Sequence, residues 1–165
     1  MSIDDLVKGG GVTGAAFAVS VAMMVVGALG EKDPEGHRLA QEGLRLCRAW
    51  LAGERIRAEE IAVYVDDPDE DKDLGLREEI VGDEENLVSV LAVLTLALGM
   101  VARLAFDAEG NSNRPTAVWE TRPEMLHDLV DFALRTGVCP QAELDALISR
   151  FSTWRAGPIP LPDLP

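Results

Sequence analysis

Two long segments without charged side chains constrain this chain more than any other feature of its sequence. Residues 12–30 and 86–102 contain no Asp, Glu, Lys or Arg, and the first is long enough to cross a membrane as a helix. Within it, Thr13, Ser20 and Gly27 recur every seven residues, a small polar stripe typical of contact between helices. The flanking charges are mixed and lack the excess of Lys and Arg that orients membrane helices. We therefore expect two central helices of a soluble bundle, with a membrane hairpin as the alternative.

The rest of the chain also follows helical spacing. Asp33 suits an N-cap, Pro34 the first helical position and Gly53 a helix end. The predicted helices begin near residues 12, 34, 57, 84, 123 and 140, with one or two further turns at 76–81, and residues 111–121 are predicted to be a loop. At 165 residues the chain fits one domain. We predict an all-α, single-domain bundle of about six or seven helices over residues 1–156, followed by an extended Pro-rich tail over 157–165.

Charge and cysteine content restrict the class of partner and the compartment. The formal net charge of -14 repels nucleic acid and anionic lipid and attracts cationic partners. Cys47 and Cys139 lie far apart and form no disulfide framework, which favours a reducing cytosol. The start of the chain, with Asp4 and Asp5, does not resemble a secretory signal. We expect a cytoplasmic protein that binds neither nucleic acid nor membrane.

The motifs that could carry chemistry are incomplete. A G-x-G-x-x-G match at residues 9–14 has no strand before it, so it does not predict dinucleotide binding. The acidic residues of 67–78 follow a calcium-loop register, but Lys72 occupies the position that needs glycine. Glu124 and His127 form a single E-x-x-H step, where a di-iron bundle needs two. We expect no catalytic residue, no cofactor and no metal site.

The best functional candidate is the acidic stretch from residue 66 to residue 85. It holds eleven acidic residues against only Lys72 and Arg77, and so carries a net charge of −9 out of the total of −14. A patch of this kind is suited to docking on a basic surface, and the alternative is a solvated loop that keeps the protein soluble. The candidate partner-binding residues are Asp66, Asp67, Asp69, Glu70, Asp71 and Asp73, extended by Glu78, Glu79 and Asp83.

Trp119 is a second candidate for partner binding. It lies in the predicted loop beside Val118 and Glu120. Tryptophan is enriched among the residues that dominate protein interfaces. The alternative is that Trp119 covers the core.

Several features follow one another in a recognisable order: an apolar helix with cysteine, a short helix running into an acidic loop, an alanine-rich long helix, and a loop before a closing acidic helix. They are carried by Leu44, Cys47, Trp50 and Leu51, by Ile61, Tyr64, Val65 and Asp66, by Ala97, Ala102 and Ala105, and by Pro115. From about Leu39 onward this layout resembles an all-helical family of immunity proteins from bacterial polymorphic-toxin systems.

The resemblance implies a protein that neutralises a cognate toxin in the cell that makes it, without catalytic residues or a cofactor. The partner would be the toxin protein, with a basic binding surface. For a nuclease toxin, the acidic patch would occupy the basic substrate groove in place of phosphates. The alternative function is that of an acidic helical chaperone or adaptor for a secreted effector.

Overall fold

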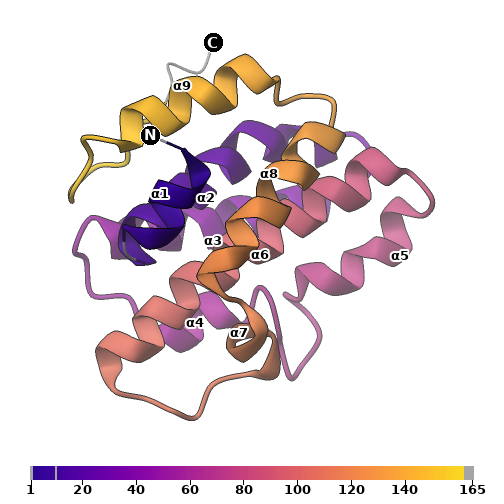
Figure 1. Cartoon of the computed structure of the whole chain (residues 1–165). Coiled ribbons are helices and arrows are strands. Elements are labelled where there is room, and N and C mark those ends of the chain that lie inside the picture. Colours follow the sequence, from indigo (N-terminus) through magenta and orange to yellow (C-terminus); the bar gives the residue numbers. More distant parts are fainter. Residues whose placement is uncertain (1, 10, 162–165) are drawn as a thin grey trace.

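The computed structural model describes residues 2–9 and 11–161, and over these residues the chain is helical without strands (Figure 1). The α-helices are α1 (Ile3–Lys8), α2 (Gly11–Val25), α3 (Pro34–Leu51), α4 (Ala58–Ala62), α5 (Glu78–Val81), α6 (Glu85–Glu109), α7 (Thr116–Glu120), α8 (Leu126–Arg135) and α9 (Gln141–Phe151). Three short 3₁₀ helices are η1 (Val26–Leu29), η2 (Leu74–Arg77) and η3 (Pro123–Met125). The prediction of an all-α fold is confirmed. The described elements outnumber the predicted ones because single turns such as α1 and α7 add to the longer helices.

The two uncharged segments form α2, with η1, and α6, and these pack on each other at the centre of the molecule. In Figure 1, α6 runs through the middle, α8 crosses in front of it and α9 lies across the top. Phe17 of α2 and Phe106 of α6 have no exposed surface. Phe151 of α9 meets Phe17 edge to face, with 6.0 Å between ring centroids. The expected central helices are therefore the core onto which the other helices pack.

Two helical stretches, Gly11–Leu29 and Glu85–Glu109, are long and apolar enough to cross a membrane. Two-thirds of the most apolar part of each, 67%, is nevertheless buried inside the protein. Ser20, in the small polar stripe, is completely buried, and its hydroxyl donates to the Ala16 carbonyl. Length and composition alone do not separate a core helix from a membrane helix, but burial against other helices is the role expected of a core helix.

We expect the protein to remain in solution when it is purified without detergent, with a mostly helical far-ultraviolet circular dichroism spectrum. The reason is that the apolar faces of α2 and α6 are covered by other helices. Sedimentation and circular dichroism of the same detergent-free sample provide the measurement. A requirement for detergent, or substantial strand content, would contradict this expectation.

One predicted loop contains a helix. Residues 111–121 were expected to form a loop throughout, and this is wrong for α7 (Thr116–Glu120). The Pro115 carbonyl accepts the N–H groups of Val118 and Trp119, and Val118 is completely buried. A single turn held by one buried side chain is too short to show helical periodicity.

The described part of the Pro-rich tail packs back on the body. The Trp154 indole N–H donates to the Pro158 carbonyl at 3.1 Å, Ile159 is buried, and Arg150 donates to the Leu161 carbonyl. Residues 157–161 contain no helix. The end of the predicted extended tail, residues 162–165, lies outside the described residues.

Candidate functional site

The acidic loop, defined here as residues 66–73, is pinned at its base. The N–H of Leu74 donates to the Tyr64 carbonyl at 3.0 Å, and the Leu74 side chain is completely buried. Compact surface loops whose ends meet in this way are frequently functional. Glu70 has a φ of 63°, in the left-handed region that costs energy for residues other than glycine, so the turn is held by its surroundings. The loop is thus a defined structure.

Two of the six carboxylates organise the loop itself. The Asp67 side chain accepts the backbone N–H groups of Asp69 at 3.0 Å and Lys72 at 2.9 Å, one on each oxygen. Asp73 accepts the N–H of Gly75 at 2.8 Å. Burial raises the pKa of Asp73, and the hydrogen bond from the Gly75 N–H opposes this effect. Asp67 and Asp73 therefore serve the fold of the loop as well as its charge.

The calcium-loop register is not assembled into a metal site. Both oxygens of Asp67 are engaged by backbone N–H groups. Across residues 2–9 and 11–161, no three His, Cys, Asp or Glu side chains come together in a way that could hold a metal ion. His127 instead lies 3.0 Å from a carboxylate oxygen of Asp4. His127 thus contributes to a surface contact between α8 and α1.

The three outermost loop residues, Asp69, Glu70 and Asp71, are exposed. In the described part of the chain they form no ion pair. Their charge is therefore available to a partner, and they are the loop residues best placed to attract one.

The segment after the loop is held against α3 by an ion pair between the buried Asp33 and the partly exposed Arg77. Arg77 of η2 donates two hydrogen bonds to Asp33, from Nε to Oδ2 at 2.9 Å and from Nη2 to Oδ1. Asp33, 2% exposed, is also the N-cap of α3, accepting the N–H of Gly36 at 3.0 Å. The predicted N-cap is thus confirmed, but its partner Arg77 was not foreseen. The Arg77 hydrogen bonds hold the pKa of Asp33 below its ordinary range against the opposing effect of burial.

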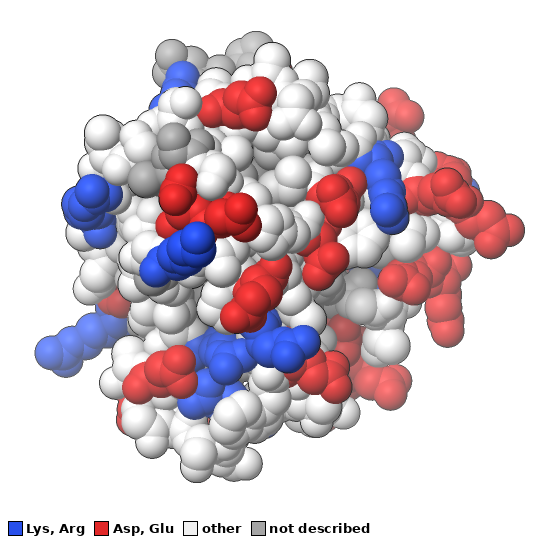
Figure 2. Space-filling view, in the orientation of Figure 1, with Lys and Arg blue, Asp and Glu red and all other residues white. Residues whose placement is uncertain are grey.

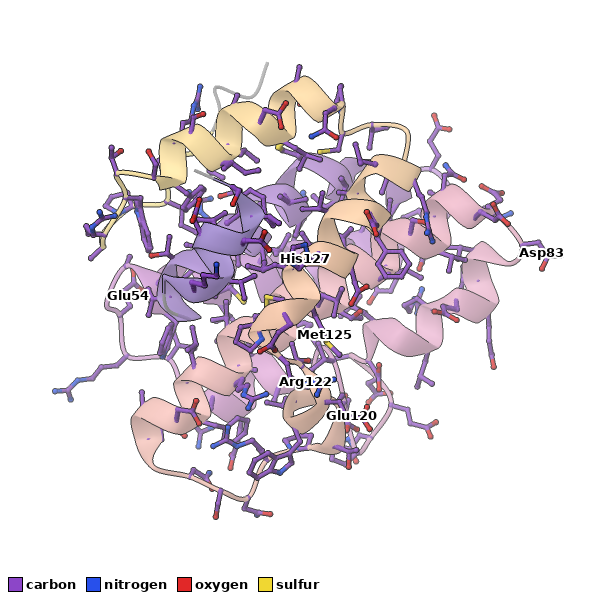
Figure 3. The ribbon with its side chains drawn as sticks, viewed as in Figure 1. Glu54, Asp83, Glu120, Arg122, Met125 and His127 are labelled. Carbon is purple, nitrogen blue, oxygen red and sulfur yellow. The ribbon has the colours of Figure 1, made fainter. Side chains whose placement is uncertain are left out.

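The acidic residues that extend the patch lie on and after α5. Glu78, Glu79 and Asp83 are exposed. Figure 2 shows acidic side chains gathered along the margin of the molecule where α5 and the start of α6 lie in Figure 1. Figure 3 shows Asp83 pointing outward at this margin, well away from Glu120 at the end of α7. The acidic surface therefore continues from the loop along α5.

Trp119 lies on α7 rather than in a loop, and its side chain is partly packed and partly exposed. It is 49% exposed, yet its ring stacks 4.6 Å from the guanidinium of Arg114. The Arg114 side chain, 7% exposed, lies between this ring and Phe106, and it pairs with Asp107 at 2.8 Å. The contact gives Trp119 a covering role and leaves half of its surface open. Sequence reasoning did not identify Arg114, because nothing local marks a long-range cation–π contact.

A surface groove of about 540 Å³ joins the two sequence-predicted regions. Asp66 and Pro68 of the acidic loop line it together with Arg114, Pro115 and Thr116. Asp66 Oδ2 lies 3.5 Å from the N–H of Ala117 at the start of α7. The structure therefore brings the acidic loop beside the start of α7, whereas Glu78, Glu79 and Asp83 do not line this groove. Glu59 also lines the groove and was missed, because it belongs to α4 and not to the acidic stretch.

Both cysteines are buried: Cys47 is completely inaccessible, and Cys139 is 2% exposed. Burial raises the pKa of the Cys47 thiol, and burial together with Glu143 raises the pKa of Cys139 to about 11. Both thiols are therefore protonated at neutral pH, and a protonated thiol is a poor nucleophile. Their placement is that of small packing residues.

The sequence matches the model of a known protein family. The family model for immunity protein Imm6 matches residues 13–136, from α2 through α8. The resemblance noted from Leu39 onward is thus extended to the apolar first helix, while α9 and the tail lie beyond the match. No curated protein and no solved structure matches the chain. Because the matched residues make up most of its length, the chain belongs to the Imm6 family of immunity proteins of toxin systems.

Proposed function

We propose that this chain binds and neutralises a cognate bacterial toxin through the acidic surface formed by the acidic loop and α5. Membership of an immunity-protein family supports a toxin as the partner. The observation that carries the choice of surface is the acidic loop: its base is pinned by Leu74, and it holds Asp69, Glu70 and Asp71 exposed. A surface that is already ordered loses less conformational entropy on binding than a mobile one.

The net charge indicates the chemistry of the partner. A protein of net charge -14 is attracted to a toxin surface rich in Lys and Arg. A nuclease toxin has such a surface where it binds phosphates, and carboxylates in that groove would exclude its substrate. Inhibition by occupation needs no catalytic group and no cofactor. The encounter takes place in the cytoplasm of the cell that makes both proteins.

The proposal predicts that a toxin domain is encoded next to the gene for this chain, and it is tested with that domain. We expect cells that produce the toxin domain to survive only when they also produce this chain, and the two purified proteins to form a stable complex. Growth assays and analytical size-exclusion chromatography provide the measurements. Absence of both protection and complex would contradict the proposal. A complex formed only with the precursor form of a secreted protein, without protection, would instead favour the chaperone or adaptor.

A further inference from the structure

Two aliphatic side chains project outward from the acidic surface. Leu76 is 46% exposed and Ile80 is 47% exposed. They lie four residues apart, across the junction of η2 and α5, a separation of about one helical turn. Leu74 and Val81 of the same segment are 0% and 1% exposed and serve as its core contacts. The segment thus buries Leu74 and Val81 and leaves Leu76 and Ile80 partly exposed to solvent.

The backbone that carries Leu76 and Ile80 is held in place at three points. Arg77 lies between Leu76 and Ile80 in sequence, and its partly buried ion pair with Asp33 holds this turn against the start of α3. Leu74 and Val81 fix the two ends of the segment in the core. Because the turn is ordered before any partner arrives, little conformational entropy is lost when Leu76 and Ile80 become buried in a complex.

The surroundings of the pair indicate its partner. Glu78, Glu79 and Asp83 are exposed on the same short segment and the turn after it, so the aliphatic pair has acidic neighbours along the chain. An apolar centre with a charged rim is the usual anatomy of a protein interface. Its complement is an apolar pocket bordered by Lys and Arg side chains.

We propose that Leu76 and Ile80 are the apolar anchor of the toxin complex and insert into an apolar pocket on the basic surface of the toxin. This inference rests on the proposed function and adds a division of roles to it. The carboxylates speed the encounter, whereas the aliphatic pair sets the lifetime of the complex, because buried apolar anchors act mainly on dissociation.

The test uses the double variant Leu76→Gln/Ile80→Gln of the full chain. Binding is followed by surface plasmon resonance with an inactive form of the toxin domain encoded next to the gene for this chain. We expect Kd to rise roughly 30-fold or more through faster dissociation, with an association rate close to that of the parent. The thermal midpoint should stay near that of the parent, because both side chains are already half exposed. If glutamine perturbs the fold, the variant Leu76→Ala/Ile80→Ala repeats the measurement.

The chain offers a matched control in Leu134 and Val138. These residues are 38% and 47% exposed and are also four residues apart, at the end of α8 and in the turn that follows it. The variant Leu134→Gln/Val138→Gln should bind as the parent does. Dissociation of the Leu76→Gln/Ile80→Gln variant at the parent's rate would overturn the anchor and leave the proposed function standing. Faster dissociation of the control variant alone would place the anchor on α8 and would also overturn the inference. Failure of the parent chain to bind would overturn the proposed function and the anchor with it.

Discussion

Replacing Asp33 with alanine is expected to lower the free energy of unfolding by about 1.5–3 kcal/mol, the contribution of hydrogen bonds to a charged group, because the Arg77 side chain is only partly buried. Arg77 then loses the carboxylate that accepts its two hydrogen bonds. The same change removes the N-cap of α3, a loss of about 1 kcal/mol in other helices that overlaps with the first effect. Urea unfolding of parent and variant, followed by circular dichroism, measures the difference.

Glu35 provides the control for this variant. It lies two residues from Asp33 and also pairs with an arginine, Arg38, but both side chains are more than half exposed. Exposed ion pairs contribute little to stability because water screens them. The Glu35→Ala variant should therefore unfold almost as the parent does. If Asp33→Ala and Glu35→Ala have equal effects, Asp33 does not fasten α3 to η2.

The same ion pair has a defined pH dependence. Arg77, with the N–H of Gly36, holds the pKa of Asp33 below the ordinary aspartate value of 3.8. The stabilisation by ionised Asp33 is therefore complete above the ordinary value and is lost as the pH falls below it, through the folded-state pKa. The stability difference between the parent and an Asp33→Asn variant should shrink over this acidic range. The comparison isolates Asp33, because Asp73, whose pKa is raised by burial, contributes with the opposite sign to both proteins.

The absence of charge from two long segments made the core of this fold predictable. The uncharged segments are long enough to specify buried helices, and α2 and α6 indeed lie at the centre. The start of α3 was predictable because an N-cap aspartate followed by proline is a local signal. The ion pair between Asp33 and Arg77 was not predictable, because its partners are 44 residues apart in sequence. No local pattern specifies a contact of that separation.

The candidate site was predictable in charge but not in detail. The sequence places eleven acidic residues between residues 66 and 85. It does not reveal that Asp67 and Asp73 accept backbone N–H groups while Asp69, Glu70 and Asp71 remain exposed. The segment at 76–81 is also too short for periodicity to assign its faces. Only the structure shows that Val81 is buried while Leu76 and Ile80 of the same segment are exposed.

Neutralising the three outermost loop residues is expected to slow association with the toxin by on the order of tenfold at low salt, because exposed carboxylates steer the encounter. The variant is Asp69→Asn/Glu70→Gln/Asp71→Asn, and it leaves Asp67 and Asp73 in place because they hold the loop together. The association rate should also depend less on ionic strength than that of the parent. Stopped-flow association between low and physiological salt measures both effects.

A second variant tests whether the effect depends on where the negative charges are removed or only on how many are removed. Glu124→Gln/Asp128→Asn/Asp131→Asn removes the same three charges from exposed positions on η3 and α8. The two variants have equal net charge, so a general effect of the protein's field would slow both equally. Steering by the acidic loop predicts a larger loss in the loop variant, with a thermal midpoint equal to or above that of the parent, because repulsion within the loop is relieved. Equal association rates for the two variants would leave the loop as a solubilising surface, and the toxin interface would then lie elsewhere, with Trp119 on α7 as the next residue to change.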